Sequence, residues 1–314
     1  MTLAFVFPGQ GAQTIGMGKA LAEEYHEAQL VFDEVDNALG ERLSKLIWEG
    51  DQEELTLTQN AQPALMATSI AAFRALEAEG VSLDDVSFVA GHSLGEYSAL
   101  AAAGALTLTD TAKLLRVRGL AMQEAVPVGK GAMAAILGLD LEAVHKVAAD
   151  SAEGEVCTVA NDNDPSQVVV SGNRDAVMRA VENAKAAGAK RAVLLPVSAP
   201  FHCPLMEPAA DRMANALSHV DIFEPKVPVV ANVRATAQTS ATLIRNLLVE
   251  QVTGTVRWRE SVGWMGEQGV TNIWEVGAGK ALSGMIRRIN RDIACRAVGT
   301  PEDVKAAVAA LKEG

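Results

Sequence analysis

One serine of this chain has neighbours that suit a nucleophile. Ser93 lies between Gly91 and Gly95 in VSFVAGHSLGEYSAL, residues 86–100. The apolar run before it predicts a strand and the run after it a helix, and such a turn exposes a serine hydroxyl above the edge of a sheet. The glycines are needed there because the turn is strained and side chains would clash. A serine that only caps a helix is the alternative.

A serine needs a general base at neutral pH, and the chain has five histidines. His202 is our candidate, because its loop LLPVSAPFHCPLM is stiffened by prolines and its apolar setting favours a neutral imidazole. An ordinary structural role for His202 stays open. His92 is next to Ser93, but adjacent side chains of an extended strand point apart. Cys203 could replace the serine as nucleophile, although its geometry beside the histidine would be awkward. No Asp or Glu stands out as the third member of a catalytic triad. A backbone or amide oxygen is left to take that place and orient the histidine.

The first predicted strand ends in a glycine-rich loop. Gln10 lies between Gly9 and Gly11 in FPGQGAQ. Such a loop can direct a backbone N–H at a carbonyl under attack, with the N–H of Leu94 as a second donor. As a dinucleotide-binding motif the loop lacks its third glycine, and EVGAGKALSG does not fit a phosphate-binding loop. We therefore expect no nucleotide cofactor.

One arginine falls on the apolar face of a predicted helix, residues 110–125. Arg118 follows Leu114 by four residues and precedes Ala121 by three, which places it on the inward stripe. An inward arginine needs an anion, because an unpaired buried charge is very costly. The anion is either an internal carboxylate or the carboxylate of a substrate, which a guanidinium can bind through two hydrogen bonds.

Composition limits the class of protein. The 314 residues carry a net charge of −12, which argues against a nucleic-acid partner. No apolar run approaches the eighteen or so residues that cross a bilayer, and the start of the chain indicates a buried strand instead of a signal peptide. Cys157, Cys203 and Cys295 are far apart, without metal-binding spacing, which favours free thiols in a reducing compartment. We expect a cytoplasmic protein without a metal site.

Strand-like and helical runs alternate, which predicts an α/β fold. The expected strands are 3–7, 86–90, 227–233 and 272–277, and the expected helices are about 16–38, 41–48, 60–80, 94–103 and 110–125. Residues 128–196 have the order β-α-β-β-α-β, with a turn at NDNDPS (161–166), which is the ferredoxin-like order. We expect a small subdomain, 128–196, inserted into a larger unit made of 1–127 and 197–314.

Six motifs together resemble one family. In order, they are FVFPGQGAQ, GHSLGEYSAL, MQEAVPVGKGAMAAILGL, NDPSQVVVSG, SAPFHCPLM and WEVGAGKAL. On these motifs the chain is identified as a member of the malonyl-CoA:acyl carrier protein transacylases of bacterial fatty acid synthesis, which are similar to the acyltransferase domains of polyketide synthases. The resemblance covers essentially the whole chain. It implies an α/β-hydrolase-like core with an inserted ferredoxin-like subdomain.

The resemblance also implies roles for the catalytic residues. Ser93 would be the acylated nucleophile and His202 its base. Gln251, in VEQVTGTVRW, matches the residue whose carbonyl orients the histidine. Sequence patterns alone did not single out Gln251.

The same resemblance implies how the substrate is held. The backbone of Gln10 and Leu94 would form the oxyanion hole, and Arg118 would bind the free carboxylate of the malonyl group. Phe201 is typical of members that select malonyl over methylmalonyl groups. Ala12 stands where many relatives have serine, but that loop acts through its backbone.

The activity implied is ping-pong transfer of malonyl from its coenzyme A thioester to the phosphopantetheine thiol of acyl carrier protein, without a metal or redox cofactor. We expect a monomer that binds this acidic carrier at basic residues, with these candidates: Lys280, Arg287, Arg288 and Arg291. Taken singly, each is more typical of a plain solvated helix face. The alternatives are a serine thioesterase or other hydrolase, an acyltransferase for a related acyl-CoA in polyketide synthesis, and a binding module without catalysis.

Overall fold

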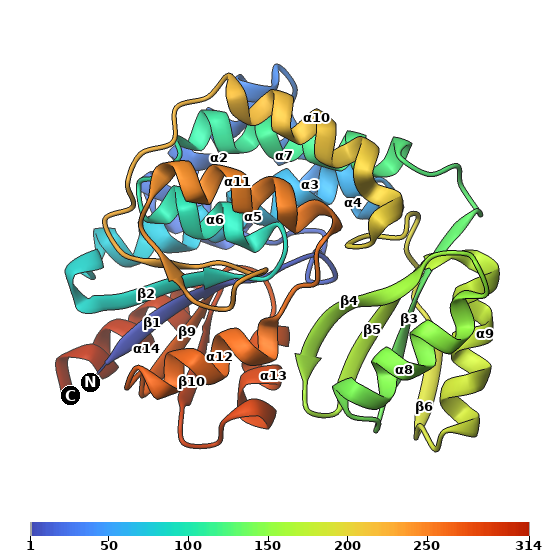
Figure 1. Cartoon of the computed structure of the whole chain (residues 1–314). Coiled ribbons are helices and arrows are strands. Elements are labelled where there is room, and N and C mark those ends of the chain that lie inside the picture. The colour runs from blue at the N-terminus through green and yellow to red at the C-terminus, as the bar shows by residue number, and fades with distance from the viewer. Residues whose placement is uncertain (1, 314) are drawn as a thin grey trace.

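The computed structural model describes residues 2–313 and contains two sheets with their helices (Figure 1). The strands are β1 (Leu3–Phe7), β2 (Val86–Gly91), β3 (Gly131–Leu137), β4 (Cys157–Asp164), β5 (Gln167–Asn173), β6 (Arg191–Leu194), β7 (Val229–Val230), β8 (Ala237–Gln238), β9 (Asn272–Val276) and β10 (Ala294–Val298). The helices are α1 (Lys19–Glu24), α2 (His26–Leu39), α3 (Leu43–Glu49), α4 (Gln52–Thr56), α5 (Thr58–Ala78), α6 (Gly95–Ala102), α7 (Leu108–Glu124), α8 (Leu141–Ala152), α9 (Arg174–Ala186), α10 (Glu207–Ser218), α11 (Ala241–Thr253), α12 (Trp258–Glu267), α13 (Ala281–Ile289) and α14 (Pro301–Glu313). Two 3-10 turns, Leu83–Asp85 and Pro204–Met206, complete the described elements.

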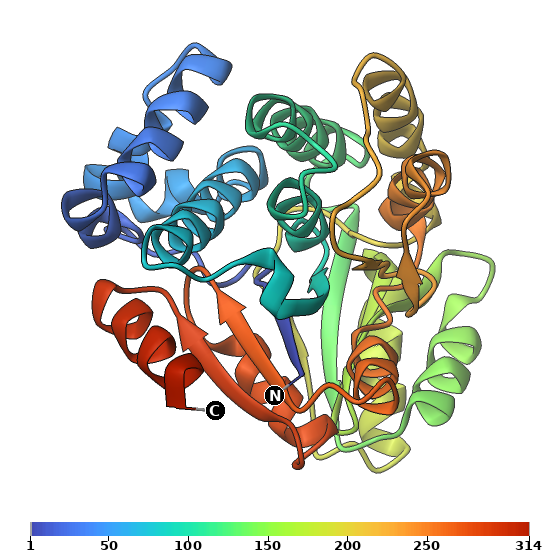
Figure 2. The same ribbon diagram turned by 90° about the vertical axis from the view of Figure 1, so that its left-hand side faces the viewer.

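The larger sheet is parallel in the order β10-β9-β1-β2-β7, and β8 adds an antiparallel edge. Every residue of β1 is buried, because both faces of the sheet are covered. Leu3, Phe5 and Phe7 face the cluster that contains α2, α5 and α6, whereas Ala4 and Val6 face α12 and α13. Figures 1 and 2 show these helices on opposite sides of the sheet. The central strands are therefore a rigid, fully covered base for the loops at their carboxyl ends.

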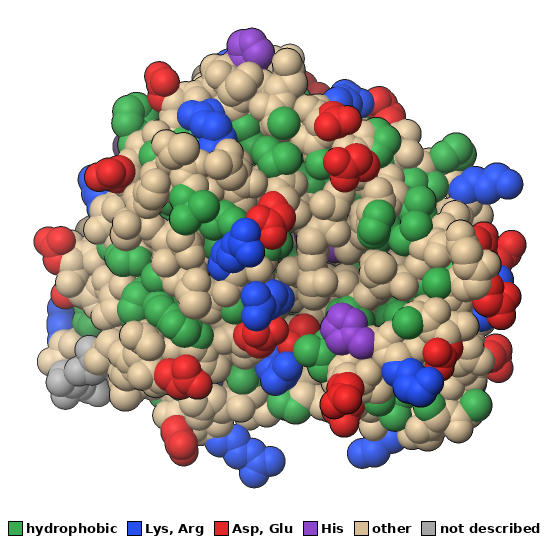
Figure 3. All heavy atoms as spheres, in the orientation of Figure 1, with side chains coloured by type: hydrophobic (Ala, Val, Ile, Leu, Met, Phe, Trp, Pro, Cys, Tyr) green, Lys and Arg blue, Asp and Glu red, His purple; other side chains and the backbone are tan. Residues whose placement is uncertain are grey.

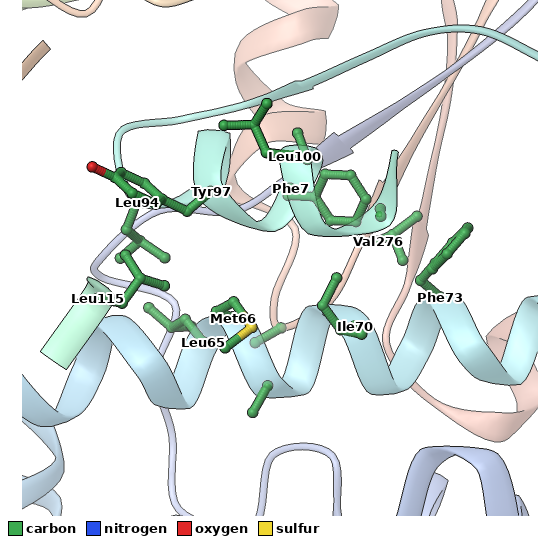
Figure 4. Packing of buried hydrophobic residues seen from close by; sticks show 14 of the residues in the cluster. Phe7, Leu65, Met66, Ile70, Phe73, Leu94, Tyr97, Leu100, Leu115 and Val276 are labelled. Carbon is green, nitrogen blue, oxygen red and sulfur yellow. The ribbon is translucent and has the colours of Figure 1, made fainter. Parts of the chain in front are cut away.

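Helices α5 and α6 pack against each other beside this sheet. Figure 4 shows Leu65, Met66 and Ile70 of α5 turned toward α6 and the end of β1. Tyr97 and Leu100 of α6 lie in the same cluster and are fully buried. This packing fixes α6, the helix that follows Ser93.

The smaller sheet is antiparallel in the order β4-β5-β3-β6. Helices α8 and α9 cover one face, where their valines and alanines pack on alternate residues of β3 and β5. On the other face Met133, Ala135 and Val169 join the hydrophobic cluster of the larger unit. This is the expected ferredoxin-like arrangement beside an α/β-hydrolase-like core, so the predicted fold class is confirmed.

The turn predicted over 161–166 is confined to 165–166, and the prediction is wrong for 161–164. Strand β4 continues through Asp164, and its four last residues, Asn161–Asp164, are buried although all are polar. The physical reason is long-range pairing: Asp162 binds Arg259 of α12, and Asp164 binds Arg288 of α13. A polar strand is stable here because partners from the larger unit satisfy it.

Three other expectations differ from the structure. The helix predicted over 16–38 is two helices, because Tyr25 between α1 and α2 is extended. The strand predicted over 227–233 is shorter in the structure, where only β7 (Val229–Val230) is extended, and β10 was not predicted.

Within residues 2–313, no helix combines the length and the apolarity that crossing a membrane requires.

Candidate active site

Ser93 lies on a strained turn between β2 and α6. Its φ of 53° is in the left-handed region, which side chains rarely adopt and which costs on the order of 1–3 kcal/mol. A Cβ on Gly91 would lie 1.9 Å from the carbonyl carbon of Gly95, and one on Gly95 would lie 2.3 Å from the backbone oxygen of Phe7. Both glycines are therefore required by close backbone approach. The N–H of Ser93 donates to Oδ1 of Asn232 at 2.8 Å, which holds the turn from the other side.

His202 meets Ser93 from 109 residues further along the chain. The Oγ of Ser93 lies 2.7 Å from Nε2 of His202, and Nδ1 lies 2.8 Å from the backbone oxygen of Gln251. A carbonyl oxygen only accepts, so Nδ1 carries the proton and Nε2 keeps its lone pair for the serine. Burial, reinforced by the charge of Arg118, lowers the pKa of His202 to about 3. The imidazole is therefore neutral at physiological pH.

Arg118 is 1% exposed, as its place on the inward face of α7 predicted. Its Nη1 donates to Oε1 of Gln62 at 2.7 Å, and its Nη2 donates to Oε1 of Gln251 at 2.8 Å and to Oγ of Ser93 at 3.1 Å. Within residues 2–313 no carboxylate forms an ion pair with it, so the internal partner that the sequence left open is absent. Its Nε is buried without an acceptor. Burial lowers the pKa of this guanidinium. A buried cation without a directly paired carboxylate therefore lies beside the serine.

Gln10 and Leu94 line the same cleft as Ser93, His202 and Arg118, with a cavity volume of ≈ 410 Å³. In the part of the chain that the structure describes, the backbone N–H of neither residue donates to an acceptor. The side chain of Gln10 is fixed separately, since its Oε1 accepts from Oγ1 of Thr58 at 2.9 Å. Both backbone donors are thus available to a ligand in the cleft.

The rest of the cleft wall is mainly apolar. Met122 and Met133 lie on it with Phe201 and the segment 195–197, which leads from the smaller sheet back to the larger unit. A mostly apolar cleft with a few polar groups is typical of a small-molecule site. Among the described residues, no three His, Cys, Asp or Glu side chains form a group that could hold a metal ion.

Behind the serine lies a buried polar group that the sequence did not reveal. Glu96 is 2% exposed, and its Oε2 accepts from Nε2 of Gln251 at 2.8 Å and from the N–H of Asn232 at 3.1 Å. Burial raises the pKa of Glu96 to about 7, although these hydrogen bonds and the charge of Arg118 oppose the shift. The available signal was a polar residue inside an apolar run, as in GEYSAL for Glu96 and VVANV for Asn232.

The rival residues are occupied elsewhere. Cys203 is fully buried, its Sγ donates to the backbone oxygen of Pro200, and burial raises its pKa. The Nε2 of His92 lies 2.9 Å from Oδ1 of Asn163 on β4. The other histidines are exposed. The structure therefore brings only His202 to the serine hydroxyl among the described histidines.

The four basic candidates for carrier binding are all exposed, but they differ in their partners. Arg288 binds buried Asp164 through Nε at 2.9 Å and Nη2 at 2.8 Å. Lys280, Arg287 and Arg291 form no ion pair among the described residues. On the face shown in Figure 3, basic and acidic side chains are intermixed.

Known proteins resemble the chain over its whole length. The acyl transferase domain family matches residues 4–294. The malonyl CoA-acyl carrier protein transacylases of Bacillus subtilis (strain 168) and Escherichia coli (strain K12) are 49% and 46% identical over 312 and 305 residues, which cover 99% and 97% of this chain and 98% of each relative. The crystal structure of the acyl-carrier-protein-S-malonyltransferase from Bartonella henselae has a TM-score of 0.97 at 55% identity and covers 99% of this chain and 100% of its own. A structure of a type II PKS acyl-carrier protein in complex with its malonyl-transacylase has a TM-score of 0.96 at 42% identity, covering 99% and 100%. The chain therefore belongs to the acyltransferases and, among them, to the malonyl CoA-acyl carrier protein transacylase family.

Proposed function

We propose that this acyltransferase moves a malonyl group from malonyl-CoA to the phosphopantetheine thiol of acyl carrier protein through an ester on Ser93. One observation carries the proposal. The Oγ of Ser93 lies 2.7 Å from Nε2 of the neutral His202 imidazole and 3.1 Å from Nη2 of Arg118. Arg118 is buried and forms no ion pair with a carboxylate of the described residues. A nucleophile, its base and a receptor for a carboxylate thus meet at one atom.

In the first half-reaction, Oγ of Ser93 attacks the thioester carbonyl while Nε2 of His202 takes the hydroxyl proton. The backbone oxygen of Gln251 accepts from Nδ1 and so stabilises the imidazolium that forms, in the place that a carboxylate has in other triads. The tetrahedral intermediate places its negative oxygen between the N–H groups of Gln10 and Leu94. The carbon–sulfur bond then breaks, and His202 returns the proton to the sulfur of coenzyme A.

The second half-reaction repeats these steps in reverse order. The carrier thiol gives its proton to His202, its sulfur attacks the malonyl ester, and the oxygen–carbon bond to Ser93 breaks. The proton returns to Oγ, so the enzyme is regenerated. Each step balances without a metal or redox cofactor, and none is part of the proposal.

Arg118 selects the acyl group in this scheme. A malonyl carboxylate can take the open Nε and the Nη2 hydrogen that reaches Oγ of Ser93, while Gln251 keeps its own hydrogen bond to the guanidinium. An acetyl group offers no such anion. Phe201 lines the same cleft and would oppose a bulkier α-substituted group.

The carrier would bind at Lys280, Arg287 and Arg291, with Arg288 partly committed to Asp164. We further propose a monomer in the cytoplasm that serves fatty acid synthesis. The free state of all three cysteines, Cys157, Cys203 and Cys295, is consistent with a reducing compartment. Sedimentation of the purified protein tests the oligomeric state.

The test is intact-mass analysis after mixing with malonyl-CoA. We expect one malonyl adduct on the wild type and none on Ser93→Ala. Addition of phosphopantetheinylated carrier protein should then move the adduct to the carrier. A wild type that gains no adduct, in a rapid-quench experiment that also captures short-lived esters, would refute the transferase mechanism.

The same experiment separates the transferase from a serine thioesterase, which shares the serine and the histidine. A thioesterase would release free malonate at the same rate with or without the carrier protein. A binding module would retain carrier binding in Ser93→Ala and form no adduct in either protein.

A further inference from the structure

Gln251 holds two functional groups of the site at once. Its backbone oxygen accepts from Nδ1 of His202 at 2.8 Å, and its side-chain Oε1 accepts from Nη2 of Arg118 at 2.8 Å. It lies near the C-terminal end of α11 and is fully buried. A rotation of this side chain would therefore release the arginine, whereas the histidine depends on the backbone of the same residue.

The carboxamide of Gln251 works in only one of its two orientations. Its oxygen and nitrogen are nearly equal in size, so hydrogen-bond partners decide which end faces which group. Nε2 faces three acceptors: Oε2 of Glu96 at 2.8 Å, the backbone oxygen of Ser93 at 3.0 Å and Oδ1 of Asn232 at 3.3 Å. In the flipped orientation, an NH₂ group would meet the guanidinium and an oxygen would meet the carboxylate. Glu96 makes the shortest of the three contacts that favour the observed orientation.

Glu96 is outside the chemistry already described. It lies in the first turn of α6, its side chain is buried, and it does not line the cleft. Its two hydrogen-bond partners both belong to the site: Gln251, and Asn232, whose Oδ1 accepts the N–H of Ser93. A buried carboxylate is costly unless its contacts repay the loss of water. Here both hydrogen bonds of Oε2 lead to residues that bind the nucleophile.

We propose that Glu96 is a positioning residue, whose carboxylate oxygen fixes the carboxamide of Gln251 and thereby keeps Arg118 in place. The inference rests on the proposed function. It requires an acceptor oxygen and no negative charge, because both partners of Oε2 are neutral N–H donors and no described cation forms an ion pair with Glu96.

Two substitutions of similar volume separate the acceptor from the charge. Glu96→Gln keeps an oxygen for both donors, whereas Glu96→Leu removes it. We expect malonylation of Ser93 within about threefold of the wild type in Glu96→Gln and a loss on the order of 10²-fold in Glu96→Leu, as misplaced catalytic groups cause. Loss of Arg118 support should also lower the ratio of malonyl to acetyl transfer about tenfold in Glu96→Leu.

Glu275 provides a matched control. It is also a fully buried acid, and it accepts the N–H groups of Leu282 and Ser283 at the start of α13, without contact to the site. If Glu96 only stabilised the fold, Glu96→Leu would behave like Glu275→Leu, with equal losses for malonyl and acetyl transfer per folded molecule. That equality, or full malonyl activity in Glu96→Leu, would overturn the inference.

A measurement on the wild type covers the case in which Glu96→Leu does not fold. The side-chain NH₂ signals of ¹⁵N-labelled Gln251, identified by their loss in Gln251→Met, should resist hydrogen exchange and should lose this protection in Glu96→Met. Unprotected signals in the wild type would refute the inference. If the wild type is not malonylated at all, the proposed function fails; if it is malonylated and the Gln251 signals are unprotected, only the role of Glu96 fails.

Discussion

Two clusters of polar side chains, each containing a buried acid, are built differently in this protein. The site cluster lies behind the nucleophile and consists of Glu96, Arg118, Asn232 and Gln251. The joint cluster links β4 of the smaller sheet to α12 and α13 of the larger unit and consists of Asp162, Asp164, Arg259 and Arg288. In the joint cluster each acid has an arginine. In the site cluster the acid and the arginine are separated by the amide of Gln251.

This difference appears in the two arginines. The hydrogen bond to Asp162 raises the pKa of Arg259, whereas burial lowers the pKa of Arg118. Uncompensated buried charge destabilises a fold, so the site cluster gives up stability to keep a cation free for a ligand. The joint cluster has no such opening. We therefore expect changes in the site cluster to act on catalysis and changes in the joint cluster to act on stability.

The largest effect should follow from Ser93→Ala. We expect malonyl transfer to fall about 10⁴-fold or more, because removal of a nucleophile leaves only binding and the oxyanion donors. The free energy of unfolding should change by roughly 1 kcal/mol or less, since one hydroxyl is lost. Steady-state assays measure the rate of malonyl transfer, and urea unfolding measures the free energy of unfolding. Residual transfer near the wild-type rate would show that another group carries the acyl chain.

Arg118→Ala should have the second-largest effect on malonyl transfer. Malonyl transfer should fall on the order of 10³-fold, because a carboxylate in the cleft loses two or more charge-assisted hydrogen bonds. Acetyl transfer should fall by about tenfold or less, since an acetyl group does not use the guanidinium. Parallel assays with the two thioesters measure the ratio. Equal losses would make Arg118 structural and would remove the contrast between the clusters.

Sequence patterns located the parts of the site that local structure defines. Ser93 follows from the strand, the tight turn and the helix around it, and Arg118 follows from the period of α7. These features depend on neighbours within a few residues. The ferredoxin-like order likewise follows from runs whose periods are short.

The remaining parts depend on contacts between distant segments. Ser93 and His202 meet over 109 residues, and Gln251 joins them from α11. The four polar residues of β4 favoured a turn by composition, but Arg259 and Arg288, far along the chain, make them a strand. Glu96 was missed for the same reason, because its partners are Asn232 and Gln251.

The pH dependence of stability should reveal the buried acid of the site cluster. Burial raises the pKa of Glu96 from 4.5 to about 7, although its hydrogen bonds with Asn232 and Gln251 and the charge of Arg118 oppose the shift. The folded state therefore holds this proton more tightly than the unfolded state. The contribution of Glu96 to the free energy of unfolding is complete below pH 4.5 and is lost as the pH rises through 7. The change amounts to about 3 kcal/mol.

Urea unfolding of the wild type and Glu96→Gln measures this change. The wild type should lose about 3 kcal/mol relative to the variant between pH 4.5 and pH 8, while His202 contributes equally to both proteins and cancels. Glu260→Gln is a control of opposite sign. The hydrogen bond with Arg257 lowers the pKa of Glu260. The contribution of Glu260 to the free energy of unfolding is therefore present above pH 4.5 and is lost toward acidic pH. A difference that does not vary with pH would mean that Glu96 is ionised in the folded protein at every pH tested.

The smallest effect should come from the joint cluster, where Arg288 and its neighbour Arg287 form a matched pair. Both are exposed residues in the last turn of α13, but only Arg288 binds the buried carboxylate of Asp164. Arg288→Gln should lower the free energy of unfolding by about 1–2 kcal/mol, a value reduced for the exposure of Arg288, because it leaves Asp164 without its cation. Arg287→Gln should leave stability unchanged.

The same pair separates stability from carrier binding. If both arginines contact the acidic carrier, each variant should raise the KM for the carrier by a similar factor, with kcat for malonylation from coenzyme A unchanged. Only Arg288→Gln should also lower Tm, by roughly 2–4 °C for each kcal/mol. An Arg288→Gln protein with weaker carrier binding and wild-type Tm would mean that Asp164 finds another partner. The ion pair would then not hold β4 against α13, and the joint cluster would be as adaptable as the site cluster.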